Sequence, residues 1–197
     1  MAKKIIMVGS GYIANSFIAN NFHNYQFYIS SRKEKTYKNL PYLGDLFSPE
    51  SNFDKLNADI LIFSLSASSF RNTSLEDVAS FIESFEIFLY KFKKSNIRKI
   101  IFLSSSSVYG LSGSRSKFYE SQELLDDTAY RIEKIKSEKL IASILNNKKD
   151  KSYMILRLSN PYGLFDHMSK NGVINKCFLS LNSGQPVTIN NSGKSFR

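Results

Sequence analysis

The chain has 197 residues, of which 42% are hydrophobic and 14% aromatic, enough apolar material for one substantial core. Its single cysteine, Cys177, excludes an internal disulfide, and the N-terminus lacks the pattern of an export signal, so we expect a cytoplasmic protein. No apolar run approaches the roughly 20 residues needed to cross a bilayer, so we expect no membrane partner.

The formal net charge of +10 is concentrated partly in lysine clusters that follow apolar helical stretches. Lys91, Lys93 and Lys94 follow one such stretch, and a second cluster lies within 148–151. Cations at a helix C-terminus offset the negative end of the helix dipole. We therefore interpret the clusters as solvated helix ends and expect no nucleic-acid partner. The alternative is that these lysine clusters attract a phosphorylated small molecule.

Short β-rich apolar runs alternate with longer helical stretches along the chain. The predicted strands are 4–8, 26–30, 60–65, 99–104 and 153–158, with a further strand before Gly44, and the predicted helices are 12–22, 75–92 and 130–145. Strand and helix in alternation imply right-handed crossovers and a parallel sheet covered on both faces. The sequence predicts a doubly wound α/β fold.

Two local patterns support the later helices. Thr73 and Glu76 have the spacing of a capping box at the start of the helix 75–92. An apolar stripe at helical spacing marks the helix 130–145 and consists of Ile132, Ile135, Leu140, Ile141, Ile144 and Leu145. We interpret this stripe as core.

The first predicted strand runs into a glycine turn of the form G-x-G-x-x-A, from Gly9 through Gly11 to Ala14. Gly9 permits a tight turn, Gly11 lets backbone approach a pyrophosphate, and Ala14 allows close packing of helix on strand. The helix N-terminus that follows offers N–H donors and positive potential. We predict that Gly9, Gly11, Tyr12 and Ile13 bind a dinucleotide, against the alternative of a purely structural turn.

The second predicted strand ends at Ser30, followed by Ser31 and Arg32. An NAD site usually has an acidic residue here for the ribose 2′-hydroxyl, whereas an arginine suits the 2′-phosphate of NADP. We therefore expect NADP or NAD as cofactor, with NADP favoured by Arg32. Asp45 and Leu46 are expected near the adenine.

A polar constellation follows the strand 99–104. Ser105 lies just after this strand, and Tyr130 and Lys134 share one face of the next helix because they are four residues apart. An ammonium there is expected to lower the phenol's pKa from about 10, and Ser105 could hydrogen-bond the same substrate oxygen. Taken singly, each residue also has an ordinary packing explanation.

The succession of motifs resembles the extended short-chain dehydrogenase/reductases, in particular the NAD-dependent epimerase/dehydratase family of nucleotide-sugar enzymes. The motifs are the glycine turn, Ser-Ser-Ser-Val-Tyr-Gly at 105–110, Tyr130-x-x-x-Lys134, Arg157-Leu-Ser-Asn160-Pro-Tyr162-Gly163, and the segment 193–197 ending in Arg197. The resemblance implies a Rossmann-type domain over 1–165 and an incomplete substrate-binding segment over 166–197.

The resemblance also implies roles for single residues. Ser105 would be the catalytic hydroxyl, Tyr130 the acid/base, and Lys134 the residue that tunes the phenol and holds the nicotinamide ribose. The substrate would be bound by Ser105, Ser106, Asn160 and Arg197. Sugar 4,6-dehydratases have an acidic pair after the catalytic hydroxyl, where this chain has Ser106 and Ser107. Dehydration is therefore disfavoured.

We expect an NAD(P)-dependent nucleotide-sugar epimerase or 4-keto-sugar reductase, and its relatives imply a homodimer formed through the helices 75–92 and 130–145. The alternative is a non-catalytic dinucleotide-binding protein, because relatives continue past Arg197. Phe81, Phe85, Phe88 and Phe92 are either part of the dimer surface or all core. His23 and His167 lack metal-ligand spacing, so no metal site is expected.

Overall fold

The computed structural model describes residues 2–33, 40–67, 73–110, 117–162 and 173–187. The strands are β1 (Lys4–Val8), β2 (Gln26–Ser30), β3 (Ile60–Phe63), β4 (Lys99–Ser105) and β5 (Ser152–Leu158). The helices are α1 (Tyr12–Asn21), α2 (Leu75–Lys94), α3 (Ala129–Leu145) and α4 (Val173–Asn182), and a short 3-10 helix, Ser106–Tyr109, follows β4 directly.

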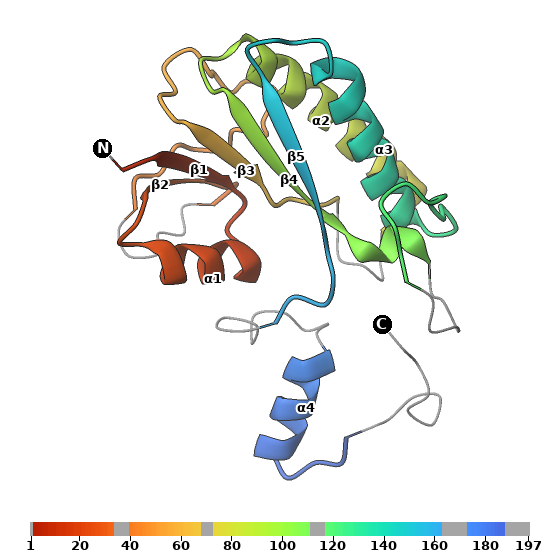
Figure 1. Ribbon diagram of the computed structural model, residues 1–197. Coiled ribbons are helices and arrows are strands. Elements are labelled where there is room, and N and C mark those ends of the chain that lie inside the picture. The colour runs from red at the N-terminus through yellow and green to blue at the C-terminus, as the bar shows by residue number, and fades with distance from the viewer. Residues whose placement is uncertain (1, 34–39, 68–72, 111–116, 163–172, 188–197) are drawn as a thin grey trace.

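The strands form one parallel sheet in the order β2-β1-β3-β4-β5. Figure 1 shows α1 on one face of this sheet and α2 with α3 on the other. The predicted doubly wound α/β fold is confirmed. The chain moves outward from β1 to β2 and then returns to place β3 on the other side of β1, so the strand order reverses between β1 and β3. Such a reversal leaves a crevice at the carboxyl ends of these two strands, where α/β proteins bind ligands.

The larger core cluster lies between the sheet and the helices α2 and α3. Phe63 of β3 and Phe102 of β4 pack there against α2. The four phenylalanines of α2 are all buried, namely Phe81, Phe85, Phe88 and Phe92. Each buried ring of this size contributes on the order of 1.5–3 kcal/mol. These four residues are therefore core, and a dimer through α2 would have to use other side chains.

A smaller core cluster lies under α1, where Ala14 and Ile18 pack against Ile5, Met7 and Phe27. Ala14 is buried, which agrees with its predicted role in close helix-to-strand packing. This packing fixes α1 against the sheet, with its N-terminus at the carboxyl end of β1.

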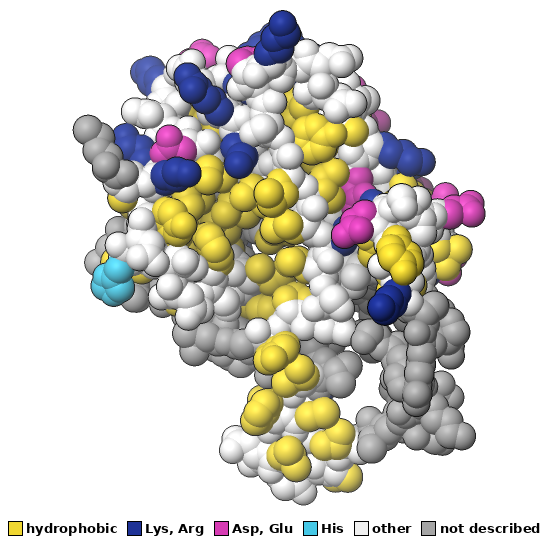
Figure 2. Space-filling view, in the orientation of Figure 1, with side chains coloured by type: hydrophobic (Ala, Val, Ile, Leu, Met, Phe, Trp, Pro, Cys, Tyr) yellow, Lys and Arg dark blue, Asp and Glu magenta, His cyan; other side chains and the backbone are white. Residues whose placement is uncertain are grey.

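The face of the molecule seen in Figure 2 carries exposed hydrophobic side chains on α4. The exposed large hydrophobic residues of α4 are Ile174, Phe178, Leu179 and Leu181. Cys177 of the same helix is half-buried. Within the described ranges, no helix combines the length and apolar character that a bilayer crossing requires.

Two local predictions were wrong in detail. The capping box of α2 is formed by Ser74 and Asp77, one position after the predicted pair of Thr73 and Glu76. The side chain of Ser74 accepts a hydrogen bond from the amide of Asp77, and the carboxylate of Asp77 accepts one from the amide of Ser74. The strand expected before Gly44 is reduced, in the described part of this region, to a single bridge between Tyr42 and Ile29. Pro41 has no N–H to extend such a ladder.

Candidate functional site

The glycine turn lies at the carboxyl end of β1, inside the crevice between β1 and β3. Gly9 has φ of +108°, and a Cβ on it would clash with Ser64 Oγ, so only glycine fits. Gly11 is the N-cap of α1, and a Cβ there would meet nothing within 4 Å. Space is therefore open above the first turn of α1, where no acidic side chain offsets the positive helix end. This cradle fits a dinucleotide pyrophosphate.

The residues predicted at the adenosine end gather after β2. The amide of Ser31 donates to the Gly44 carbonyl at 3.1 Å, which brings Arg32 near Asp45 in space. Arg32 is exposed. The Asp45 carboxylate accepts from the amide of Phe47 at 3.0 Å. The side chain of Leu46 packs in the core, so that residue offers a ligand only its backbone.

Ser105 and Tyr130 are brought together by β4 and α3. Ser105 is the last residue of β4, and Tyr130 lies in the first turn of α3, whose N-cap Thr128 accepts from the amide of Arg131. The hydroxyl of Ser105 lies near the Tyr130 phenol, close enough to lower its pKa. Ser105 Oγ also accepts from the amide of Ser107 at 3.2 Å. The predicted hydroxyl and phenol therefore form one polar pair at the edge of the sheet that carries the glycine turn.

The expectation that Lys134 lowers the pKa of Tyr130 was wrong for this structure. Burial raises the pKa of the phenol above its usual 10.0, the hydrogen bond from Ser105 works in the opposite direction, and the charge of Glu133 raises the pKa further. The Lys134 ammonium lies 5.6 Å from the centroid of the Tyr130 ring, but it is paired with the Glu133 carboxylate at 3.2 Å. The neighbouring negative charge offsets the effect of the ammonium.

Lys134 itself is buried between α3, β4 and the loop after β3. Its Nζ lies 5.2 Å from the centroid of the Phe102 ring and donates to the Leu65 carbonyl at 3.4 Å. Burial lowers the pKa of Lys134, while Glu133 and, more weakly, Glu138 raise it. The carboxylates therefore favour the ammonium in an apolar setting.

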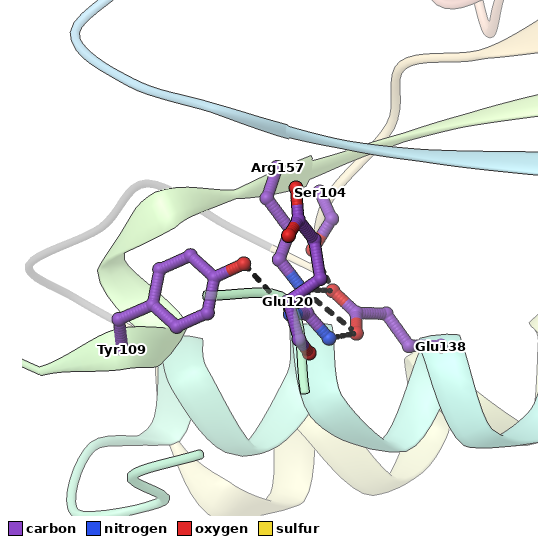
Figure 3. A network of polar contacts seen from close by, with 5 residues as sticks. All are labelled: Ser104, Tyr109, Glu120, Glu138 and Arg157. Carbon is purple, nitrogen blue, oxygen red and sulfur yellow. Dashed lines mark hydrogen bonds and ion pairs between the residues drawn. The ribbon is translucent and has the colours of Figure 1, made fainter. Parts of the chain in front are cut away.

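A polar network next to this pair ties α3 to β4 and β5 (Figure 3). Nε and Nη2 of Arg157 donate to the Glu138 carboxylate, with the shortest contact at 2.7 Å. Ser104 Oγ donates to the same carboxylate at 2.5 Å. Nη1 of Arg157 donates to the hydroxyl of Tyr109 at 2.9 Å and to the Glu120 carbonyl at 3.2 Å. Charge-assisted contacts of this kind make the guanidinium the centre of a rigid junction.

The network lies next to the candidate site, one residue away along β4 and one helical turn away along α3. Ser104 precedes Ser105 on β4, and Glu138 follows Lys134 by one turn of α3. The sequence did not predict the roles of the Glu133 and Glu138 carboxylates or the buried network. The available signal was the spacing, since Tyr130, Lys134 and Glu138 recur every four residues and therefore share one helix face.

The segment after β5 lies beside the N-terminus of α1. The hydroxyl of Tyr12 donates to the carbonyl of Pro161 at 3.0 Å, and an open groove there is lined in part by Ile13 and Tyr162. Asn160 is exposed and has φ of +39°, a left-handed conformation that asparagine tolerates. Ser106 is half-buried at the start of the 3-10 helix. Arg197 lies outside the described residues.

Among the residues that the structure describes, no group of three His, Cys, Asp or Glu side chains could hold a metal ion. His23 is described and makes an edge contact with the ring of Phe22. His167 lies outside the described ranges.

Several solved structures with a similar fold are described as 4-epimerases of UDP-linked sugars. A UDP-N-acetylglucosamine 4-epimerase from Methanobrevibacter ruminantium M1 matches with a TM-score of 0.78 and 21% identity, over 93% of this chain and 64% of that chain. A UDP-N-acetylglucosamine 4-epimerase from Bacillus cereus matches with a TM-score of 0.78 and 20% identity, over 95% of this chain and 63% of that chain. A UDP-glucuronic acid 4-epimerase from Bacillus cereus, solved in complex with UDP-glucuronic acid and NAD, has a TM-score of 0.76 and 18% identity, over 94% of this chain and 65% of that chain. The chain thus spans a little less than two thirds of these proteins, and the likeness establishes the fold.

No curated protein matches the chain. A family model, however, matches residues 42–197, which include Ser105, Tyr130, Lys134 and Arg157 and leave out the glycine turn. The matched range covers most of the chain, and its described part contains β3 to β5 with their helices. The chain belongs to the NAD dependent epimerase/dehydratase family.

Proposed function

We propose that the chain is the NAD(P)-binding part of an enzyme that transfers hydride at a carbon of a nucleotide-linked sugar, acting as an epimerase. The observation that carries this proposal is the placement of Ser105, at the end of β4, beside Tyr130 in the first turn of α3, with the Lys134 ammonium 5.6 Å from the centroid of the same phenol ring. The pair stands at the sheet edge where the glycine turn opens. Family membership and the similarity to 4-epimerases support the same conclusion.

The dinucleotide would lie across the crevice, with its pyrophosphate over the turn that contains Gly9, Gly11, Tyr12 and Ile13. The open space at Gly11 and the uncompensated N-terminus of α1 support this position. The adenosine end would reach the cluster of Ser31, Arg32, Asp45 and Leu46. Tyr130 and Lys134 would hold the nicotinamide ribose. When bound, the nicotinamide supplies a hydride acceptor and donor for the sugar carbon.

The chain's own residues supply the proton chemistry. Tyr130 would exchange a proton with the sugar oxygen, and Ser105 would hydrogen-bond that oxygen and hold it in place. In an epimerase cycle Tyr130 would accept the hydroxyl proton as hydride leaves the sugar carbon, and would return that proton when hydride comes back to the other face. The substrate contacts assigned to Ser106, Asn160 and Arg197 remain predictions of the family resemblance, as does the division of the chain into 1–165 and 166–197.

A second candidate is a 4-keto-sugar reductase, favoured by one observation. Arg32 is exposed two residues after the end of β2, where its guanidinium is available to a ribose 2′-phosphate. NADPH is the usual hydride source for reductions, and a reductase needs only half of the epimerase cycle. Ser106 and Ser107 cannot act as an acidic pair, which disfavours dehydration.

Calorimetry with NAD⁺, NADH, NADP⁺ and NADPH tests the first step. We expect binding of at least one of them, and Arg32→Ala should weaken NADP(H) selectively, by about 1.5–3 kcal/mol for a lost charge-assisted contact. Absence of binding by all four would refute the proposal. Equal affinity for NAD(H) and NADP(H) would remove the argument for the reductase.

Turnover of UDP-sugars tests the second step. Tyr130→Phe should lower turnover by about 10²- to 10⁴-fold while dinucleotide affinity stays nearly unchanged, because the hydroxyl acts on the substrate proton. The matched control is Tyr90→Phe, since Tyr90 is an exposed tyrosine of α2. Dinucleotide binding without any turnover would favour the alternative of a non-catalytic dinucleotide-binding protein.

A further inference from the structure

Glu133 is a carboxylate buried beside the candidate site, and the proton chemistry proposed above does not use it. Its exposed fraction is 0%, and that of its neighbour Lys134 is 3%. A charge removed from water at this depth is costly unless it is paired and hydrogen-bonded. The contacts of the Glu133 carboxylate therefore show which parts of the structure it joins.

The two carboxylate oxygens of Glu133 contact different partners. Oε1 lies 3.2 Å from the Lys134 ammonium. Oε2 accepts from Ser66 Oγ at 2.7 Å and from the amide of Ala67 at 3.1 Å. The carboxylate thus joins α3 to the loop that follows β3, and Lys134 reinforces the junction through the carbonyl of Leu65.

The same loop also contacts the glycine turn that follows β1. Ser64 donates through its amide and its hydroxyl to the carbonyl of Val8, and its Oγ occupies the space that a Cβ on Gly9 would need. A continuous chain of contacts therefore runs from the turn after β1, through residues 64–67, to Glu133 and Lys134.

We propose that Glu133 is a positioning residue of the dinucleotide site: its carboxylate holds the Lys134 ammonium and the loop 64–67 in one fixed arrangement. The role in dinucleotide binding rests on the function proposed above, whereas the hold on Lys134 and the loop is a property of the dinucleotide-free protein. Glu133 touches neither cofactor nor substrate in this scheme and acts through Lys134.

Burial lowers the pKa of Lys134, and the charge of Glu133 opposes this by raising it. Among the described residues, the titratable groups that act on this ammonium or contact it are Glu133, Glu138 and Tyr130, all from α3. The contacts from β4 and from the loop after β3 are the Phe102 ring and the Leu65 carbonyl, which do not titrate. Arg157 of β5 is engaged by Glu138. Neutralising Glu133 therefore removes the nearest negative charge, and the Lys134 ammonium should lose its proton at lower pH.

The first test uses the dinucleotide-free protein. Lys134 is titrated by NMR of ¹³C-labelled lysine, assigned with Lys134→Met, in the unmutated protein and in Glu133→Gln. We expect the Lys134 midpoint to move to lower pH in Glu133→Gln and to stay in place in Glu83→Gln, a matched removal of an exposed carboxylate on α2. An unchanged midpoint in Glu133→Gln would overturn the inference.

Hydrogen exchange tests the hold on the loop. The amide of Ala67 should stay protected in Glu133→Gln, whose side-chain carbonyl can still accept, and should exchange at least tenfold faster in Glu133→Ala, as expected when a contact of about 1.4 kcal/mol is lost. If Glu133→Ala does not fold, Ser66→Ala serves instead, because it removes one of the two loop donors and leaves the charge. Equal protection of Ala67 in all folded variants would contradict the proposed arrangement.

Dinucleotide affinity across pH separates positioning from general structural support. In Glu133→Gln, affinity should fall on the order of tenfold, the size of one charge-assisted contact, and the decline should set in at lower pH than in the unmutated protein. A merely structural glutamate would change affinity by one factor at every pH, which would overturn the inference. If the unmutated protein binds no dinucleotide, the proposed function fails, while a shifted Lys134 midpoint still upholds the hold of Glu133 on Lys134.

Discussion

Replacing Arg157 by methionine removes the cation from the network of Figure 3 and keeps an unbranched side chain. The side chain of Glu138 is only 7% exposed and that of Arg157 18%, so little water can replace the lost contacts. Breaking a buried ion pair by removing one partner costs about 3–5 kcal/mol. Because Ser104 Oγ still donates to the Glu138 carboxylate at 2.5 Å, we expect a loss near the lower end, about 3 kcal/mol.

Urea unfolding followed by far-UV circular dichroism measures this loss as a lower midpoint with an unchanged slope. Arg98→Met is the matched control, since Arg98 is exposed, and should change the free energy of unfolding by no more than about 0.5 kcal/mol. The double variant Arg157→Met with Glu138→Met removes both charges and should recover at least about 1 kcal/mol relative to the single variant. An Arg157→Met loss no larger than the control, or a double variant less stable than the single one, would refute the reasoning.

Three further predictions concern the site and the assembly. Gly9→Ala should lose about 1–3 kcal/mol of stability in thermal melts, because φ of Gly9 is +108° and the new Cβ would clash with Ser64 Oγ. Gly11→Ala, where the new Cβ meets nothing, should keep its stability and bind dinucleotide more weakly. In tyrosinate absorbance titrations, the difference between the unmutated protein and Tyr130→Phe should show a phenol that ionises above pH 10.0. The folded-state pKa is raised, so the stability linked to Tyr130 is present below pH 10.0 and lost as pH rises through the folded value; ionisation below pH 10.0 would contradict this. A homodimer through α2 and α3 stays a prediction. Ile87 is 43% exposed on α2, and light scattering should show the Ile87→Glu variant to be monomeric. If the unmutated protein is only monomeric at micromolar concentration, the homodimer is excluded.

Much of the fold was predictable because local patterns in this chain agree with the final architecture. The strands 4–8 and 26–30 were predicted with the bounds that the structure has. Their apolar runs are short and end at polar or glycine-containing segments, which restricts where a strand can stop. The capping box of α2 was misplaced by one residue because Thr73 and Ser74 are both able to cap, and a preference between them depends on backbone geometry.

The candidate site was predictable only in part. Spacing alone indicated that Tyr130 and Lys134 share a helix face, and the position of Ser105 after a strand indicated the right sheet edge. The proximity of Ser105 to Tyr130 agrees with this. The direction of the phenol's pKa shift was wrong because it depends on burial and on Glu133, and neither can be read from a tyrosine and a lysine four residues apart.

By itself, the sequence determined the α/β alternation, the glycine turn after β1 and the family resemblance, since these depend on residue types at short spacing. Only the tertiary structure decided that Glu138 and Arg157 meet across 19 residues, and that Glu133 joins Lys134 to a loop 66 residues earlier at Ala67. These contacts depend on how α3 packs against β4, β5 and the loop after β3. Buried charges must find partners wherever the packing places them, so the partners follow from three-dimensional proximity and not from sequence distance.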